Sequence, residues 1–136
     1  MAALSRKRLR PFARRAGVIR VDGTRPLPVA GGRFDRFLAV YVLDLLSPAD
    51  AWDVVAEARR VLRPGGLLCA VSLAPGVTPG TRLISRAWAA VGSRAPRLVG
   101  GCRPITLGPL LDGWDIEHRG LVSSWGLTSE VVIARR

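Results

Sequence analysis

One junction in the sequence constrains the fold more than any other feature of the chain. Residues 57–74 read EARRVLRPGGLLCAVSLA, so a charged helical tail meets Arg-Pro-Gly-Gly and passes at once into an apolar run. Proline cannot continue a helix and glycine readily takes a left-handed turn, so the helix must end here. The run at 67–73 is apolar on both faces, which indicates a buried strand. The sequence therefore predicts a helix joined to a buried strand by a tight turn.

A second apolar run precedes that helix. Residues 36–43 read RFLAVYVL and indicate another buried strand, because β-branched and aromatic residues dominate. The helix between the two runs has a capped start, with Ser47 at the N-cap, Pro48 at the first helical position and Asp50 at the third. Its predicted apolar face is formed by Trp52, Val55, Ala56, Arg59 and Leu62. The order strand, helix, strand predicts a crossover between parallel strands.

This crossover predicts where a ligand binds. In open α/β sheets, ligands bind beyond the carboxyl ends of the parallel strands. Those ends fall near residues 40–43 and 72–74. We therefore expect the functional residues of this chain to gather there.

The remaining segments complete an α/β pattern. Residues 18–21 (VIRV) predict a short strand, and Asp22-Gly23 after it predicts a turn. Thr78-Pro79 begins a helix that extends to about Val91, with Leu83, Ile84, Ala87, Trp88 and Val91 on its apolar face. Residues 109–113 predict a short helix, and 114–126 and 127–136 predict an antiparallel hairpin at the edge of the sheet.

Length, charge and cysteine content restrict the class of protein. A chain of 136 residues is long enough for one domain with a real core. No apolar run approaches the roughly 18 residues of a membrane span, and the two cysteines with a single histidine, His118, lack metal-ligand spacing. We expect a cytoplasmic protein without a metal site. The +11 net charge comes from 20 Arg and one Lys, and seven cations lie within the first 20 residues. That segment is interpreted as a solvated helix face, a basic binding patch or a targeting sequence.

A family resemblance follows from two quoted stretches. The order VDGTRPLPVAGGRFDRFLAVYVLDLL followed by EARRVLRPGGLLCAVSL resembles the C-terminal two-thirds of class I S-adenosylmethionine-dependent methyltransferases. The similarity is greatest to the small-molecule, ubiquinone/menaquinone-biosynthesis-like (type 11) group. It covers residues from about 9 to 136, and RVLRPGG between helix and strand is its most specific motif. The resemblance implies a Rossmann-like, mostly parallel sheet with helices on both faces and a C-terminal antiparallel strand pair.

The resemblance also implies which residues hold S-adenosyl-L-methionine. Asp22 matches the carboxylate that accepts from the adenine amino group, and Gly23 matches the small residue whose N–H faces the adenine ring. Val40 and Tyr41 match the positions beside the methionine and ribose parts of the cofactor. Cys102 and Arg103 lie in a loop that the family places near the methyl acceptor, where Arg103 could pair with an acidic group. No catalytic base is predicted, because the sulfonium is already activated.

One part of the family pattern does not occur in this sequence. The Gly-rich loop after the family's first strand and the acid after its second strand have no counterpart. We therefore expect an N-terminally truncated, single partial domain over 1–136, with a basic helical segment at 1–17 and the α/β core at 18–136. The primary prediction is methyl transfer to a small-molecule acceptor. The alternatives are an inactive remnant or partner subunit whose exposed sheet edge binds a homologous chain, and a basic RNA-associated protein, with nucleic acid the least favoured partner.

Overall fold

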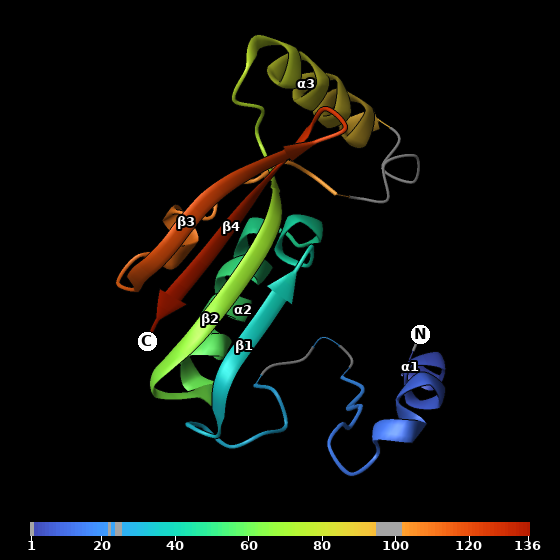
Figure 1. Ribbon diagram of the computed structural model, residues 1–136, viewed down its shortest axis with the longest axis vertical. Coiled ribbons are helices and arrows are strands. Elements are labelled where there is room, and N and C mark those ends of the chain that lie inside the picture. Colours follow the sequence, from blue (N-terminus) through green and yellow to red (C-terminus); the bar gives the residue numbers. More distant parts are fainter. Residues whose placement is uncertain (1, 22, 24–25, 95–101) are drawn as a thin grey trace.

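The protein forms a four-stranded mixed sheet packed against helices (Figure 1). The structure is a computed structural model and describes residues 2–21, 23, 26–94 and 102–136. The strands are β1 (Phe34–Val40), β2 (Leu62–Ala74), β3 (Asp115–Ser124) and β4 (Leu127–Arg135), and their order in space is β1-β2-β4-β3. β1 and β2 are parallel, whereas β4 is antiparallel to both of its neighbours. The α/β class, the parallel crossover and the C-terminal antiparallel pair are confirmed.

Helix α2 (Pro48–Val61) makes the crossover from β1 to β2, after the short 3-10 helix η2 (Leu43–Leu45). Its start has the predicted cap, in which the Ser47 hydroxyl accepts the backbone N–H of Asp50 over 3.1 Å. Such a cap satisfies one of the N–H groups that a helix start leaves without an intrahelical partner. The local sequence therefore fixes where this helix begins.

The helix passes into the strand with no intervening residue. α2 ends at Val61 and β2 begins at Leu62. Pro64 disfavours helical backbone at the residue before it, which accounts for the abrupt change. The pairing with β1 then shifts, since Phe34 pairs with Leu62 but Arg36 pairs with Leu67. The Pro-Gly-Gly segment thus forms a bulge within the strand, in addition to ending the helix as predicted.

The core lies between one face of the sheet and a layer made of α2 and the 3-10 helix η4 (Pro109–Leu111). Its fully buried members include Leu43, Ala58, Leu62, Leu68 and Leu107. The buried face of α2 differs from the predicted one: Ala51, Val55 and Ala58 are buried, whereas Trp52 is 47% exposed. Small residues allow the helix to lie close to the sheet, so the bulky tryptophan is displaced to the rim.

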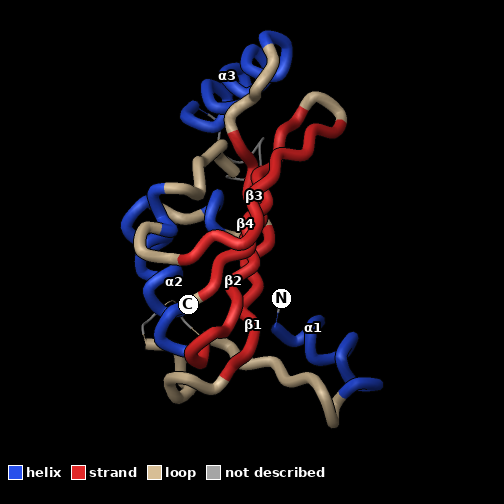
Figure 2. Tube along the Cα trace, turned by 60° about the vertical axis from the view of Figure 1, so that its left-hand side comes forward, coloured by secondary structure: helices blue, strands red, loops and turns tan. Residues whose placement is uncertain are grey.

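The opposite face of the sheet is open along β1. Figure 2 shows α2 against one face of the sheet, whereas on the other side α1 stands apart from β1 and does not cover it. On that open face Leu38 and Val40 are 68% and 48% exposed. β1 pairs only with β2, so its outer edge is free within the described residues. The predicted exposed edge is therefore present.

Two elements extend beyond the carboxyl end of β2. Helix α3 (Pro79–Arg94) lies past that end (Figure 1) and begins with the predicted Thr78 cap, which accepts the Thr81 N–H over 3.2 Å. Much of its predicted apolar face is exposed, with Leu83 at 71%.

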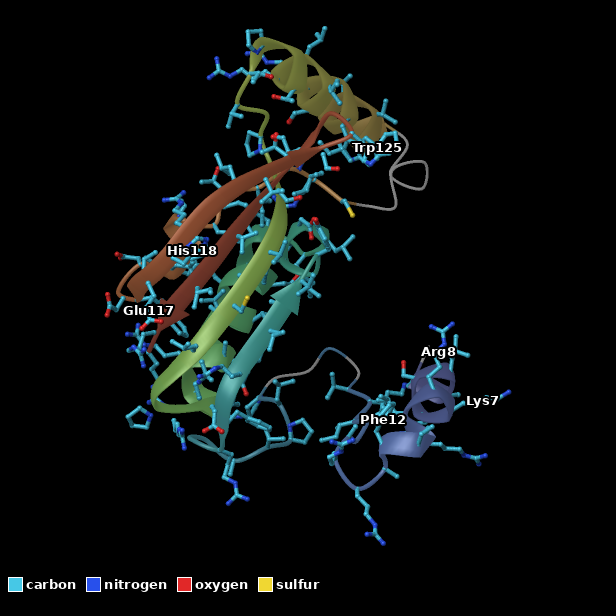
Figure 3. The ribbon with its side chains drawn as sticks, viewed as in Figure 1. Lys7, Arg8, Phe12, Glu117, His118 and Trp125 are labelled. Carbon is cyan, nitrogen blue, oxygen red and sulfur yellow. The ribbon has the colours of Figure 1, made fainter. Side chains whose placement is uncertain are left out.

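The predicted hairpin of β3 and β4 is also present. It turns at Trp125-Gly126, where both residues have positive φ, as tight hairpin turns require. Trp125 is fully exposed at the tip (Figure 3).

The N-terminal segment differs from the prediction. Helix α1 (Ala2–Leu9) and the 3-10 helix η1 (Arg10–Phe12) contain no buried residue, which agrees with a solvated basic helix. Residues 18–21 do not form the predicted strand, and Ile19 is 63% exposed. A run of four residues that includes Arg20 buries too little apolar area to hold a strand in place. Without that strand, the sheet contains one parallel pairing and two antiparallel ones.

Candidate functional site

A cavity of about 450 Å³ lies at the carboxyl end of β2, on the sheet face opposite α2. Strands β2, β3 and β4, helix α3, and the segments that follow β1 and precede η4 all contribute to its wall. The lining residues are Tyr41, Asp44, Val71, Leu73, Trp88, Cys102, Val122, Ser124, Leu127, Ser129 and Val131. Its position is the one that the crossover predicts for a ligand. The wall is largely apolar with a few polar groups, which is typical of a small-molecule site.

Tyr41 closes one side of this cavity. It directly follows β1, and its backbone N–H donates to the Val71 carbonyl over 2.8 Å. Its φ of 50° lies in the left-handed region, which a bulky non-glycine residue adopts only at a cost in free energy. The Tyr41 hydroxyl lies 2.9 Å from the Ser129 hydroxyl, so the side chain crosses over β2 to reach β4. The strained backbone directs the ring across the open face.

Asp44 forms part of the wall from η2. The residue is fully buried, and its Oδ2 atom accepts the Leu73 backbone N–H over 3.2 Å. Its backbone carbonyl accepts the Arg103 N–H over 3.0 Å, which ties the loop before η4 to the end of β1. The other carboxyl oxygen, Oδ1, has no hydrogen-bond partner among the residues that the structure describes. A buried acceptor without a donor is uncommon in folded proteins.

Cys102 lies beside Asp44 in the same wall. Burial raises the pKa of the Cys102 thiol, and the nearby negative charge of Asp44 raises it further. The Cys102 carbonyl accepts the Trp88 indole N–H over 3.3 Å, which attaches α3 to this loop. The thiol is therefore kept in its neutral form, and the indole N–H is already used.

The structure brings two of the predicted site residues together and separates the others. Tyr41 and Cys102 line one cavity, whereas Val40 lies half-exposed on the open face. Gly23 has a φ of +88°, as a turn glycine does, and an added Cβ would meet open space. Asp22 lies outside the described residues. Arg103 does not line the cavity, because its guanidinium donates to the Leu46 carbonyl.

Four polar or aromatic residues of this cavity were not predicted from the sequence, namely Asp44, Trp88, Ser124 and Ser129. They come from η2, α3, β3 and β4. Only Asp44 carried a signal, as an acid placed immediately after the apolar run VYVL. Trp88 was assigned to a helix face, and Ser129 lies inside a strand that shows no motif.

The part of the chain that the structure describes lacks two kinds of functional feature, a metal-ligand cluster and a membrane-spanning helix. Within those ranges, no group of three or more His, Cys, Asp or Glu side chains is arranged to hold a metal ion. His118 is exposed on β3 (Figure 3) and does not line the cavity. No helix in the described part of the chain combines the length and apolarity needed to cross a membrane.

A parallel crossover with an apolar cavity beyond its carboxyl ends is the arrangement in which α/β proteins hold small-molecule ligands. The family model described as "Methyltransferase domain" matches residues 1–70 of this sequence. The match spans half of the chain, and the protein therefore belongs to the methyltransferase domain family. No curated protein sequence matches the chain.

Solved structures share the fold at low sequence identity. A SAM-dependent methyltransferase from Methanosarcina mazei has a TM-score of 0.65 and 18% identity, over 82% of this chain and 63% of that one. The [4+2]-cyclase SpnF has a TM-score of 0.70 and 18% identity, over 99% and 62%. The N-methyltransferase NodS from Bradyrhizobium japonicum, in complex with S-adenosyl-L-homocysteine, has a TM-score of 0.66 and 14% identity, over 100% and 63%. This chain thus spans less than two thirds of each structure, and the likeness shows the Rossmann-like fold.

Proposed function

We propose that this chain carries out S-adenosylmethionine-dependent methyl transfer to a small-molecule acceptor, which occupies the 450 Å³ cavity. The family match supports methyl transfer, and the cavity supports a small acceptor because its walls are apolar and concave. The cavity is the single observation on which the assignment of the acceptor depends. Residues 1–136 are taken as one partial domain, and its cytoplasmic location stays a prediction from the sequence.

Asp22, Gly23, Val40 and Tyr41 are the proposed cofactor-binding residues. The described ones leave room for such a molecule: Val40 and Tyr41 are 48% and 47% exposed at the carboxyl end of β1, and no atom lies within 4 Å of a Cβ built on Gly23. A carboxylate at Asp22 beside the N–H of Gly23 complements the donor and acceptor that adenine presents side by side. When bound, the cofactor supplies a methyl group already activated on a sulfonium.

The residues of the cavity have a positioning role in this proposal. Methyl transfer requires the nucleophile and the methyl carbon in line, with water excluded, and no proton transfer from a dedicated base is needed. Val71, Leu73 and Val131 supply a dry floor, and Tyr41 and Trp88 supply aromatic walls that can orient a flat acceptor. Cys102 contributes to the same wall. Arg103 holds its loop in place through the Leu46 carbonyl, which supports a structural role in acceptor binding.

The test is calorimetric titration of the full chain with S-adenosyl-L-homocysteine. We expect saturable binding that is lost in Asp22→Ala, because the adenine amino group then has no carboxylate acceptor. Asp35→Ala is the matched control, since Asp35 is an exposed acid at the amino end of β1 that pairs with Arg63. Absence of binding to the native chain, or equal binding by Asp22→Ala, contradicts the proposal.

A partner subunit is the second candidate, favoured by the free edge of β1. Exposed Leu38 and Val40 beside unpaired backbone groups form a surface that a parallel strand of a homologous methyltransferase chain could extend. This candidate predicts a complex of defined stoichiometry with such a chain and no cofactor binding by this chain alone. Light scattering after size-exclusion chromatography measures the mass of the complex. A monomer that binds the cofactor analogue contradicts it.

A further inference from the structure

The charge of the cavity differs from the charge of the whole chain. The sequence contains 21 basic residues against 10 acidic ones. Among the described residues that line the cavity there is no Lys or Arg, and Asp44 is the one acidic residue. A negative or electron-rich group inside the cavity would therefore have no cationic partner within the described part of the wall. A positive or N–H-bearing group would have one carboxylate.

The unpaired oxygen of Asp44 points to a missing hydrogen-bond donor. Oδ2 accepts the Leu73 N–H, whereas Oδ1 has no partner in the described part of the chain although the residue is fully buried. A buried acceptor without a donor destabilises the folded state, because its hydration is lost and nothing replaces it. A donor delivered by a bound molecule would remove that penalty.

Three neighbouring donors are already used elsewhere. The Tyr41 hydroxyl is engaged with the Ser129 hydroxyl, and the Trp88 indole N–H donates to the Cys102 carbonyl. The guanidinium of Arg103 donates to the Leu46 carbonyl and does not reach the cavity. Among the described residues, no side chain of this wall is hydrogen-bonded to Oδ1.

We propose that the cavity binds amines, and that a small flat molecule places its amino group on Oδ1 of Asp44 after a slight turn of that carboxyl toward the cavity. The inference rests on the proposed function and names the class of molecule that is methylated. The charged amino group has no lone pair, so it anchors the molecule on Asp44 and is not itself the atom that accepts the methyl group. The Tyr41 and Trp88 rings favour the same ligand, since aromatic rings attract cations as well as apolar groups. An acidic acceptor, which the sequence suggested through Arg103, is the competing outcome.

Three indole compounds that differ only in their end group form the test. Tryptamine carries an ammonium group, 3-propylindole carries a methyl group in its place, and indole-3-propionate carries a carboxylate. Each is titrated calorimetrically into the full native chain at neutral pH without cofactor. We expect tryptamine to bind about tenfold more tightly than 3-propylindole, as a hydrogen bond to a charged group implies, and indole-3-propionate to bind most weakly.

Two variants locate the preference. Asp44→Asn keeps an oxygen for the Leu73 N–H and removes the charge, so tryptamine should lose its advantage while 3-propylindole binds as before. Asp112→Asn is the matched control, because Asp112 is an exposed acid outside the cavity and should leave the preference unchanged. If Asp44→Asn does not fold, the relative affinities of the three compounds for the native chain still test whether the cavity prefers amines.

The outcomes separate this inference from the proposed function. Preference for the carboxylate, equal binding of all three compounds, or no binding of any at millimolar concentration overturns the amine site. If the chain binds S-adenosyl-L-homocysteine and also gives any of those results, methyl transfer is still supported but the proposed amine class of the acceptor is wrong. Amine preference in a chain that does not bind the cofactor analogue upholds the site and contradicts methyl transfer.

Discussion

At the scale of single residues, two buried carboxyl groups differ in how completely they are hydrogen-bonded. Glu130 uses both oxygens, since Oε2 accepts the Leu107 N–H over 2.9 Å and Oε1 accepts the Arg119 Nε–H over 2.6 Å. Asp44 uses one oxygen, and the other has no donor among the described residues. The first arrangement stabilises the fold, and the second is the proposed contact for a ligand. Removing each should therefore have different effects.

Glu130→Ala should lower the free energy of unfolding by about 1–3 kcal/mol, because the buried Leu107 N–H then has no acceptor. Urea denaturation followed by circular dichroism measures this loss. Glu117→Ala is the matched control: Glu117 also pairs with an arginine, Arg135, but the pair is exposed and should contribute less than about 1 kcal/mol. Equal losses in the two variants would show that burial of Glu130 is not what matters.

Cys102 should be alkylated slowly. Its raised pKa leaves less thiolate at a given pH below that pKa, and the thiolate is the species that reacts with iodoacetamide. Asp44→Asn removes one cause of the shift, so the rate of Cys102 labelling at pH 8 should rise. Mass spectrometry of the labelled peptide gives the rate, with glutathione as the reference thiol. Labelling as fast as glutathione, or no change in Asp44→Asn, would contradict this assignment.

At the scale of elements, local sequence signals predicted where a helix begins better than they predicted which side of the helix is buried. Ser47-Pro48 and Thr78-Pro79 mark the starts of α2 and α3, because caps act over three or four residues. The buried face of α2 was assigned wrongly around Trp52, since the choice depends on how closely the sheet approaches. Large apolar residues at helical spacing therefore predicted that a helix forms, but they did not predict which face packs against the sheet.

The sequence predicted where the candidate site lies, but it predicted only some of the residues that form it. The carboxyl ends of the two parallel strands follow from the crossover, and Tyr41 was predicted on that basis together with the family resemblance. Asp44, Trp88 and Ser129 meet in one cavity only because α3 lies beyond the end of β2 and β4 pairs beside that strand. No local pattern encodes such contacts. The strand predicted at 18–21 failed for the same reason, because a short run forms only where tertiary contacts hold it.

Ser47→Ala should destabilise the protein by about 1 kcal/mol, because the Asp50 N–H loses its side-chain acceptor. Ser47→Asn should retain nearly full stability, since its side-chain carbonyl also caps a helix start and its amide N–H can donate to the Asp50 carboxylate, as the Ser47 hydroxyl does. The midpoint of urea unfolding distinguishes the two. If both substitutions cost the same, the hydroxyl of Ser47 acts through something other than the cap.

At the scale of the whole molecule, the sheet is covered unequally. α2 and η4 bury one face, whereas β1 presents exposed apolar side chains on the other face and a free backbone edge. Free, apolar strand edges are the sites at which sheets from different chains pair. The unbound chain is thus expected to associate with itself as its concentration rises.

Leu38→Lys should reduce this self-association, because a charge on the open face of an edge strand opposes pairing with another sheet. Leu83→Lys is the matched control: Leu38 and Leu83 are 68% and 71% exposed, but Leu83 lies on a helix, which has no free strand edge. Light scattering over a concentration series gives the mean mass. An equal effect of the two substitutions would assign the association to general surface apolarity.

Because α2 passes directly into β2, the orientation of the helix is fixed relative to the strand. Val61 is the last residue of the helix and Leu62 is the first residue of the strand, so no loop residue lies between them that could absorb a change in length. One inserted residue before Leu62 would turn the helix by about 100° relative to the strand, since 3.6 residues complete a turn. The cavity floor at Val71 and Leu73 belongs to that same strand. Length changes at this point should consequently disturb the core and the ligand-binding face together.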